Sequence, residues 1–232
     1  MAFSVTLGEL VTACQQLANQ VGAEQLDVTE WKAHISTRYG RIHTAVTDAG
    51  ARYFETEVTL NLAALALPSN HKATVGVDLV IAPAGNRRQL PELMIHERDL
   101  FSGLTGEARA WSFIGTALQL YPLPTSGTYL HIYVPQPTRY NTSADSTSID
   151  LITTDGYEAV LWGVASVALH RSESAQQRAI AESDAALGRL KEWSVQRALT
   201  MPRRRQVADI MGGPGGFGSI YGAWNPASWR YR

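Results

Sequence analysis

Cysteine, long apolar runs and signal-like segments are scarce or missing in this sequence. The single cysteine, Cys14, excludes an intrachain disulfide, and its place on an apolar helical stripe predicts a buried structural residue. No apolar run approaches the ~18 residues needed to cross a bilayer, and no basic segment precedes an apolar one at the N-terminus. We therefore expect a soluble protein that is made inside a cell and has no membrane partner.

Residues that would catalyse a reaction or bind a metal do not occur at useful spacings. No two histidines fall on one helical turn and no cysteine pair accompanies them, so we expect no metal site. A mixed-charge segment is interpreted as a solvated loop rather than an acid and base pair. It contains Glu92, His96, Glu97, Arg98 and Asp99. The sequence predicts neither an enzyme nor a cofactor.

Charge is divided unevenly along the chain. The net charge of −1 hides a C-terminal excess of cations, because residues 201–232 hold five arginines against a single aspartate. The first 200 residues therefore carry a net charge of −5. We expect any electrostatic preference for a partner to reside in the C-terminal segment.

Apolar periodicity predicts helices at both ends of the first 200 residues. Residues 5–21 show three- and four-residue apolar steps, and Thr6 with Glu9 has the spacing of a capping box. A second amphipathic helix is predicted over residues 29–49. Residues 155–169 are apolar on nearly all sides, which is typical of a buried helix, and a charged amphipathic helix follows to about Leu199.

Between these helices the period changes to that of strands. Residues 54–62 predict a half-buried strand and residues 74–81 predict a second strand that ends in a turn. Residues 117–121 and 128–134 predict an antiparallel pair, because prolines and a glycine separate them. Residues 90–104 are interpreted as irregular chain or a short helix.

The order of elements predicts an α+β fold rather than alternating βαβ units. Helices of residues 1–51 and 151–200 are expected to form one helical bundle. Residues 52–150 are expected to form an inserted small antiparallel β domain, and residues 201–232 an extended C-terminal arm.

The C-terminal arm (residues 201–232) combines features that rarely occur together. Six glycines between 212 and 222 exclude regular structure, yet the arm holds a quarter of the aromatic residues of the chain. The backbone entropy lost on ordering residues 206–232 exceeds the gain from burying five aromatic side chains. We therefore expect an arm that is mobile in the free protein and docks on a partner. The candidate docking residues are Arg203, Arg204, Arg205, Phe217, Tyr221, Trp224, Trp229 and Tyr231.

Two alternatives compete with docking on a protein partner. Arginines and aromatic side chains can also bind phosphates and stack on bases, so the arm is compatible with a nucleic-acid-binding module. A second alternative is that the arm wraps its own core, as chain termini often do.

Beyond these patterns, the chain resembles the head-to-tail adaptor (connector) proteins of tailed bacteriophages over about residues 30–200. Tyr53-Phe54 leads into the strand at 57–62, and Trp111-Ser112-Phe113-Ile114-Gly115 leads into the strands at 118–124 and 130–135. Asp155-Gly156-Tyr157-Glu158 then opens a buried helix, and a charged helix ends in the arm. The resemblance rests on the order of these features rather than on any one motif.

The resemblance implies a structural virion protein at the neck between capsid and tail, made in the host cytoplasm. It implies a homo-dodecameric ring beneath the portal protein, which extends the channel for DNA ejection. Genome DNA would pass through the lumen without specific binding, and tail or nozzle proteins would bind the other side. The C-terminal arm is the element that such adaptors insert against the portal.

Overall fold

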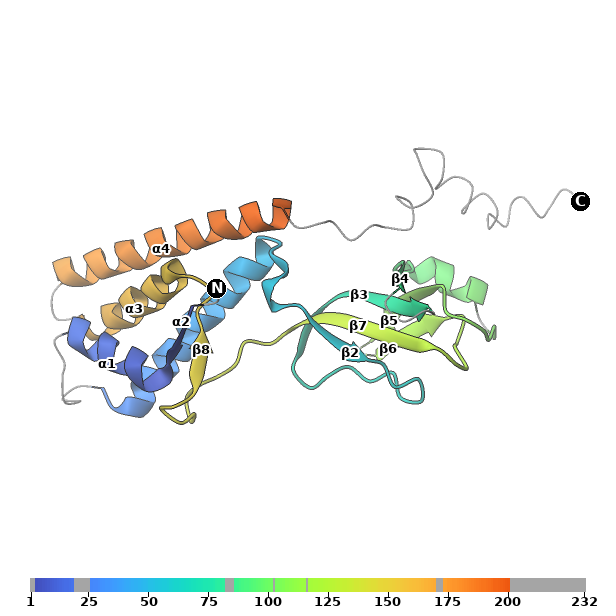
Figure 1. Cartoon of the computed structure of the whole chain (residues 1–232), viewed down its shortest axis with the longest axis horizontal. Helices are drawn as coiled ribbons and strands as arrows, with labels where there is room; N and C mark the ends of the chain where they lie inside the picture. Colours follow the sequence, from blue (N-terminus) through green and yellow to red (C-terminus); the bar gives the residue numbers. More distant parts are fainter. Residues whose placement is uncertain are drawn as a thin grey trace, which may run out of the picture. The chain divides into compact units, whose positions relative to one another are not determined.

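The protein is described by a computed structural model that covers residues 3–18, 26–81, 86–101, 103–115, 117–169 and 173–200 (Figure 1). The chain divides into a helical unit, Met1–Phe54 with Gln136–Met201, and a β unit that contains Glu55–Pro135. Helices and antiparallel sheets occur together, so the α+β class is confirmed. The C-terminal arm and its eight predicted docking residues lie outside the described residues.

The first two helices of the helical unit begin at capping boxes. In α1 (Leu7–Leu17), Thr6 Oγ1 accepts from the backbone N–H of Glu9 at 3.3 Å, and Glu9 Oε2 accepts from the Thr6 N–H at 2.9 Å. Asp27 and Glu30 form the same arrangement at the start of α2 (Val28–Asp48). Each box satisfies two backbone donors that a helix start leaves unpaired, so local residues determine where both helices begin.

Helices from both ends of the sequence share one hydrophobic core. α3 (Thr154–Ala168) lies along α4 (Glu173–Thr200), and α1 and α2 also contact α3. The largest fully buried side chain is Trp31 of α2. Cys14 of α1 is buried as predicted, and its burial raises the pKa of the thiol to about 12. This thiol is therefore protonated and inert at neutral pH.

A short antiparallel pair ties the N-terminus to the second half of the helical unit. β1 (Ser4–Thr6) pairs with β8 (Ser148–Asp150), with Val5 opposite Ile149. The chain then enters α3 through a turn in which the Thr153 side chain accepts from the Gly156 N–H at 3.3 Å.

The β unit contains a four-stranded antiparallel sheet in the order β2-β7-β3-β4. Its strands are β2 (Thr56–Thr59), β3 (His71–Ile81), β4 (Asn86–Leu90) and β7 (Thr128–Pro135). A hairpin of β5 (Ala110–Ile114) and β6 (Ala117–Tyr121) packs on it. Sheet residues such as Val77 and Tyr129 share a core with Trp111 and Leu118 of the hairpin.

The predicted pairing of residues 117–121 with 128–134 is wrong, although both strands exist. β6 pairs with β5 across a tight turn in which Gly115 has a φ of 61°, and β7 pairs with β2 and β3. The intervening segment turns aside, because the Leu123 N–H donates to Leu104 O at 3.2 Å. Proline has no N–H to donate, so the Pro122 and Pro124 positions cannot extend a ladder.

The half-buried strand predicted over residues 54–62 is also wrong in extent and burial. Phe54 ends a short 3-10 helix, η1 (Arg52–Phe54), and all four residues of β2 are exposed. β2 is an edge strand that pairs only with β7. The alternating pattern becomes a buried face only past β2, where Leu60 enters the core of the β unit and Leu62 packs against it.

The region from residue 86 to 104 confirms the short helix that was one of the two expectations for residues 90–104. It contains β4 and a second 3-10 helix, η2 (Ile95–Phe101). Glu97 Oε2 accepts from the Met94 N–H at 3.0 Å, and the Arg98 guanidinium donates to the Phe113 carbonyl. Glu97 and Arg98 are half-buried, so the expected solvated loop is replaced by a helix held against the β5–β6 hairpin.

Two histidines meet on β3 and β7 through one hydroxyl. Thr74 Oγ1 lies 2.9 Å from His71 Nε2 and 2.9 Å from His131 Nε2. The hydroxyl has one proton, so it donates to one ring and accepts from the other. The ring whose nitrogen accepts the hydroxyl proton must therefore be neutral. His131 is fully buried, stacks on Tyr133 at 5.2 Å between ring centroids, and lies 5.4 Å from the His71 ring.

Lowering the pH from about 6.5 to about 4 is expected to destabilise the β unit through His131. Burial, and then the charge of His71, lower the pKa of His131 from 6.5 to about 4. The unfolded chain binds a proton in this interval that the folded unit does not. The contribution of the neutral His131 ring to the unfolding free energy is fully present above pH 6.5. It is lost as the pH falls toward 4, which lowers the unfolding free energy by about 3 kcal/mol.

Urea unfolding of the wild type and His131→Gln across this interval measures the effect. Glutamine does not titrate, so the difference in unfolding free energy between the two proteins should shrink as the pH falls. Parallel pH profiles would contradict the assignment to His131.

Candidate partner-binding surface

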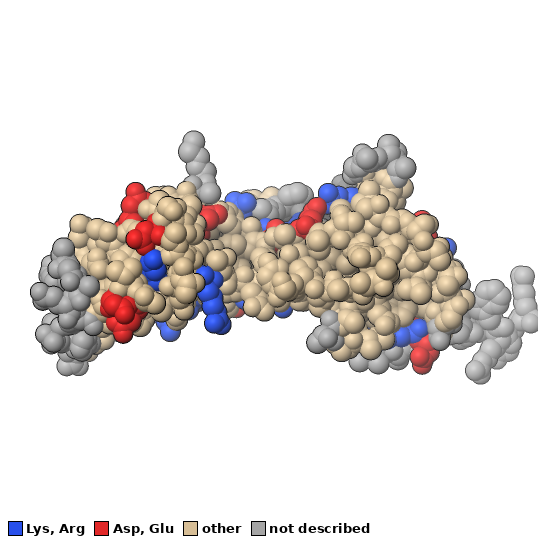
Figure 2. Space-filling view, turned by 90° about the horizontal axis from the view of Figure 1, so that it is seen from below, with Lys and Arg blue, Asp and Glu red and all other residues tan. Residues whose placement is uncertain are grey.

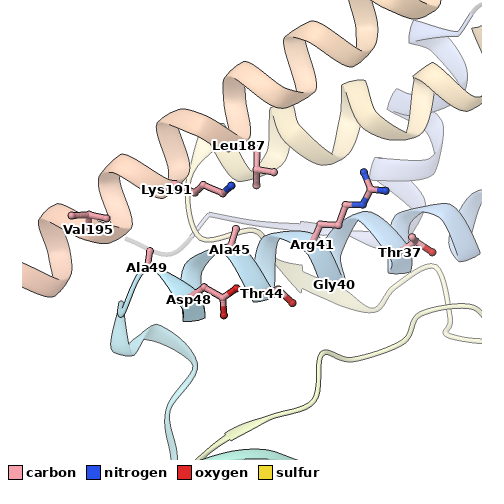
Figure 3. A pocket seen from close by; sticks show the side chains of 10 residues that line it. All are labelled: Thr37, Gly40, Arg41, Thr44, Ala45, Asp48, Ala49, Leu187, Lys191 and Val195. Atoms are coloured by element: carbon pink, nitrogen blue, oxygen red, sulfur yellow. The ribbon is translucent and has the colours of Figure 1, made fainter.

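An open groove of about 680 Å³ runs between α2 and α4 in the helical unit (Figure 3). Leu187 and Lys191 extend into it from α4, and Arg41 and Ala45 extend into it from α2. The complete lining is Thr37, Gly40, Arg41, Thr44, Ala45, Asp48, Ala49, Leu187, Lys191 and Val195.

The groove exists because α2 has two faces with different residues. Large apolar side chains at three- and four-residue steps, from Trp31 to Val46, point into the core. The second face repeats at the same steps through Thr37, Arg41, Thr44 and Asp48, all of which are exposed. Small side chains such as Ala45 and Ala49 fill the space beside α4 only partly. A neighbouring element can therefore approach the backbone of α2 closely.

Charge in the groove is unbalanced. Arg41 and Lys191 are exposed, and neither forms an ion pair with a carboxylate of the described residues. The only acidic residue of the lining is Asp48. The face in Figure 2 shows Lys and Arg interspersed with Asp and Glu over a mostly uncharged surface.

The C-terminal end of α4 is held by aromatic contacts. The Arg197 guanidinium carbon lies 5.4 Å from the ring centroid of Tyr53 and 5.3 Å from that of Trp193. The Tyr53 hydroxyl donates to Asp150 Oδ2 at 2.6 Å. Burial, and then this hydrogen bond, raise the pKa of Tyr53 to about 12. These contacts hold the last turns of α4, from which the C-terminal arm continues.

The described ranges add neither a metal-binding group nor a membrane-spanning helix to this surface. Within them, no three His, Cys, Asp or Glu side chains are grouped so as to hold a metal ion. Over the same ranges, none of the helices combines the length and the hydropathy that a membrane span requires.

The groove was not among the sites predicted from sequence, which all lie in the arm. A usable signal was present in the polar and small residues of α2 that repeat at helical steps opposite the apolar stripe. That pattern is also typical of a solvated helix face. The position of α4 beside it distinguishes the two, and this requires the tertiary structure.

Comparison with known proteins gives a match over most of the chain. A family model described as SU10 adaptor protein matches residues 5–207. No curated protein matches the chain. The matched range contains α1 to α4 and ends inside the C-terminal arm, after Arg203, Arg204 and Arg205.

Proposed function

We propose, from the premise that this chain belongs to the SU10 adaptor protein family, that it forms a ring beneath the portal and joins phage head to tail. The family match over residues 5–207 is the observation that carries this proposal, and it confirms the sequence-based resemblance to phage head-to-tail adaptors. Adaptors of this kind are structural virion proteins rather than enzymes. They associate with portal and tail components at the neck of the virion.

The ring is proposed to contain twelve copies, and its lumen to extend the channel through which DNA leaves the capsid. The charge of the chain supports a lumen that does not retain DNA. Residues 1–200 carry a net charge of −5, so a wall built from them repels phosphates on average.

The C-terminal arm is proposed to dock on the portal protein. Its five arginines and five aromatic residues offer charge-assisted hydrogen bonds and large apolar contacts. The contacts of Arg197 with Tyr53 and Trp193 support this role, because they give the arm a fixed starting point on the helical unit. We retain the prediction that the arm orders only on its partner.

Native mass spectrometry and electron microscopy of the chain mixed with its portal protein test the proposal. The expected result is a complex in which twelve copies of the chain sit on one portal ring, with twelvefold symmetry. Portal rings that remain bare at micromolar concentrations of both proteins would contradict it.

A further inference from the structure

We propose that the groove between α2 and α4 binds a second copy of this chain and forms the contact between neighbouring copies. The inference rests on the proposed function, since a ring needs a contact that repeats from copy to copy. The ring alone does not say which surface makes that contact. The geometry of the helical unit assigns it to the groove.

The charge of the groove selects an acidic occupant. Arg41 and Lys191 face the open space without an ion pair among the described residues. Asp48 is the acidic residue of the groove lining, and Asp184 lines a small adjoining pocket together with Arg41. Two exposed cations on an apolar floor favour a surface that supplies carboxylates. A nucleic acid would also supply negative charge, but Leu187, Ala45, Ala49 and Val195 favour a protein surface with apolar side chains.

The same unit carries the complementary charge elsewhere. Its described residues include nine Lys and Arg against twelve Asp and Glu. Outside the groove, the described residues of the unit include seven Lys and Arg against eleven Asp and Glu. The rest of the unit is therefore acidic, whereas the groove is cationic. Glu182 and Glu192 on the outer side of α4 are exposed and form no ion pair with a described residue. A second copy therefore presents the carboxylates that the groove lacks.

This arrangement predicts a head-to-tail contact rather than a twofold one. A twofold contact would place one groove against another and bring Arg41 and Lys191 close to the same cations of the partner copy. A contact between a cationic groove and a different, acidic surface uses two distinct surfaces of each chain. Such heterologous contacts repeat around a ring when the rotation closes.

Apolar side chains at the rim contribute to the same contact. Val195 is 45% exposed and Leu199 is 74% exposed on α4. Val195 lines the groove and Leu199 follows one turn later. Their burial against a second copy would remove apolar surface from water.

Sedimentation of the full chain at rising concentration, without portal, tests the inference. The wild type is expected to self-associate reversibly, and the association should weaken as salt is added. Arg41→Glu with Lys191→Glu should weaken it about a hundredfold, because carboxylates would then face carboxylates. Both residues are exposed, so the variant is expected to fold.

Arg139→Glu with Arg178→Glu is the matched control. Both arginines are exposed on the helical unit outside the groove, and the change in net charge is identical. This control should associate within about threefold of the wild type. Val195→Glu is a second groove variant that leaves both cations in place, and it should weaken association about tenfold.

The groove assignment would be overturned by a wild type that stays monomeric up to about millimolar concentration. It would also be overturned if groove and control variants associated equally. If the wild type still binds portal rings, these results contradict the groove assignment but not the proposed binding to the portal. Conversely, self-association that depends on the groove, together with bare portal rings, would support the groove and contradict the proposed function.

Discussion

Deletion of residues 203–232 is expected to abolish binding to portal rings, with a loss of affinity of at least about a hundredfold. The deletion removes five arginines and five aromatic residues, which are the residue types that dominate binding energy at protein interfaces. Pull-down of portal rings by the truncated chain measures the effect. Full binding by the truncated chain would exclude the arm as the docking element.

The truncated chain should remain folded, because α4 ends at Thr200, before the deletion, and the described residues alone already form both hydrophobic cores. Its unfolding free energy is expected to lie within about 0.5 kcal/mol of the wild type. A second variant separates the contribution of the arginines to portal binding from that of the aromatic side chains. It replaces all five aromatic residues of the arm by serine: Phe217, Tyr221, Trp224, Trp229 and Tyr231. This variant keeps every arginine, so a large loss of binding would assign the affinity to the aromatic side chains.

Replacing Gly156 by alanine is expected to destabilise the helical unit by about 3 kcal/mol or to prevent its folding. A Cβ atom at Gly156 would lie 2.0 Å from the carbonyl oxygen of Leu151, which is backbone and cannot rotate away. The first turn of α3 would have to move from the segment that follows β8. Thermal or urea unfolding of the variant measures the loss.

Two other glycines of the same unit serve as controls. At Gly188 in α4, no described atom lies within 4 Å of the position that a Cβ atom would occupy, so Gly188→Ala should stabilise by about 0.5 to 1 kcal/mol through helix propensity. At Gly163 the Cβ would lie 2.8 Å from Ser183 Oγ and 3.0 Å from Arg38 Cδ, both side-chain atoms. The unfolding free energy of Gly163→Ala should therefore lie between those of Gly156→Ala and Gly188→Ala. Any other order would contradict the steric explanation.

Local signals in the sequence predict the helices well. The capping box of Thr6 and Glu9 places the start of α1, and the apolar stripe from Trp31 to Val46 becomes the buried face of α2. The near-continuous apolar character of α3 agrees with its position inside the core. Such features depend on residues within a few positions of one another, so the sequence displays them directly.

Strand pairing depends on contacts that no local pattern encodes. β6 and β7 are separated by six residues, yet β6 pairs with β5 and β7 pairs with strands that start 72 and 57 residues earlier. Gly115 with Thr116 is a two-residue gap of the kind that closes hairpins, but the proline-rich segment after Tyr121 is the stronger turn signal in composition. The edge position of β2 likewise follows from the sheet order rather than from its alternating side chains.

The groove between α2 and α4 could not be predicted from the sequence, because it too is formed by residues that are distant along the chain. Arg41 and Lys191 lie 150 positions apart, and no pattern indicates that they share one open space. The eight docking residues predicted in the arm remain a prediction, because they lie outside the described residues.

The β unit is inserted in the sequence between the two segments of the helical unit, and this affects the order in which the newly made chain folds. The pairing of β1 with β8 joins Val5 to Ile149, and the core of α1 and α2 needs side chains of α3 and α4. The strands of the β unit, by contrast, all lie between Thr56 and Pro135 without interruption. During synthesis the β unit is therefore complete while α1 and α2 still lack their partners. Until α4 leaves the ribosome, the apolar faces of these two helices are the surface that most needs protection from aggregation.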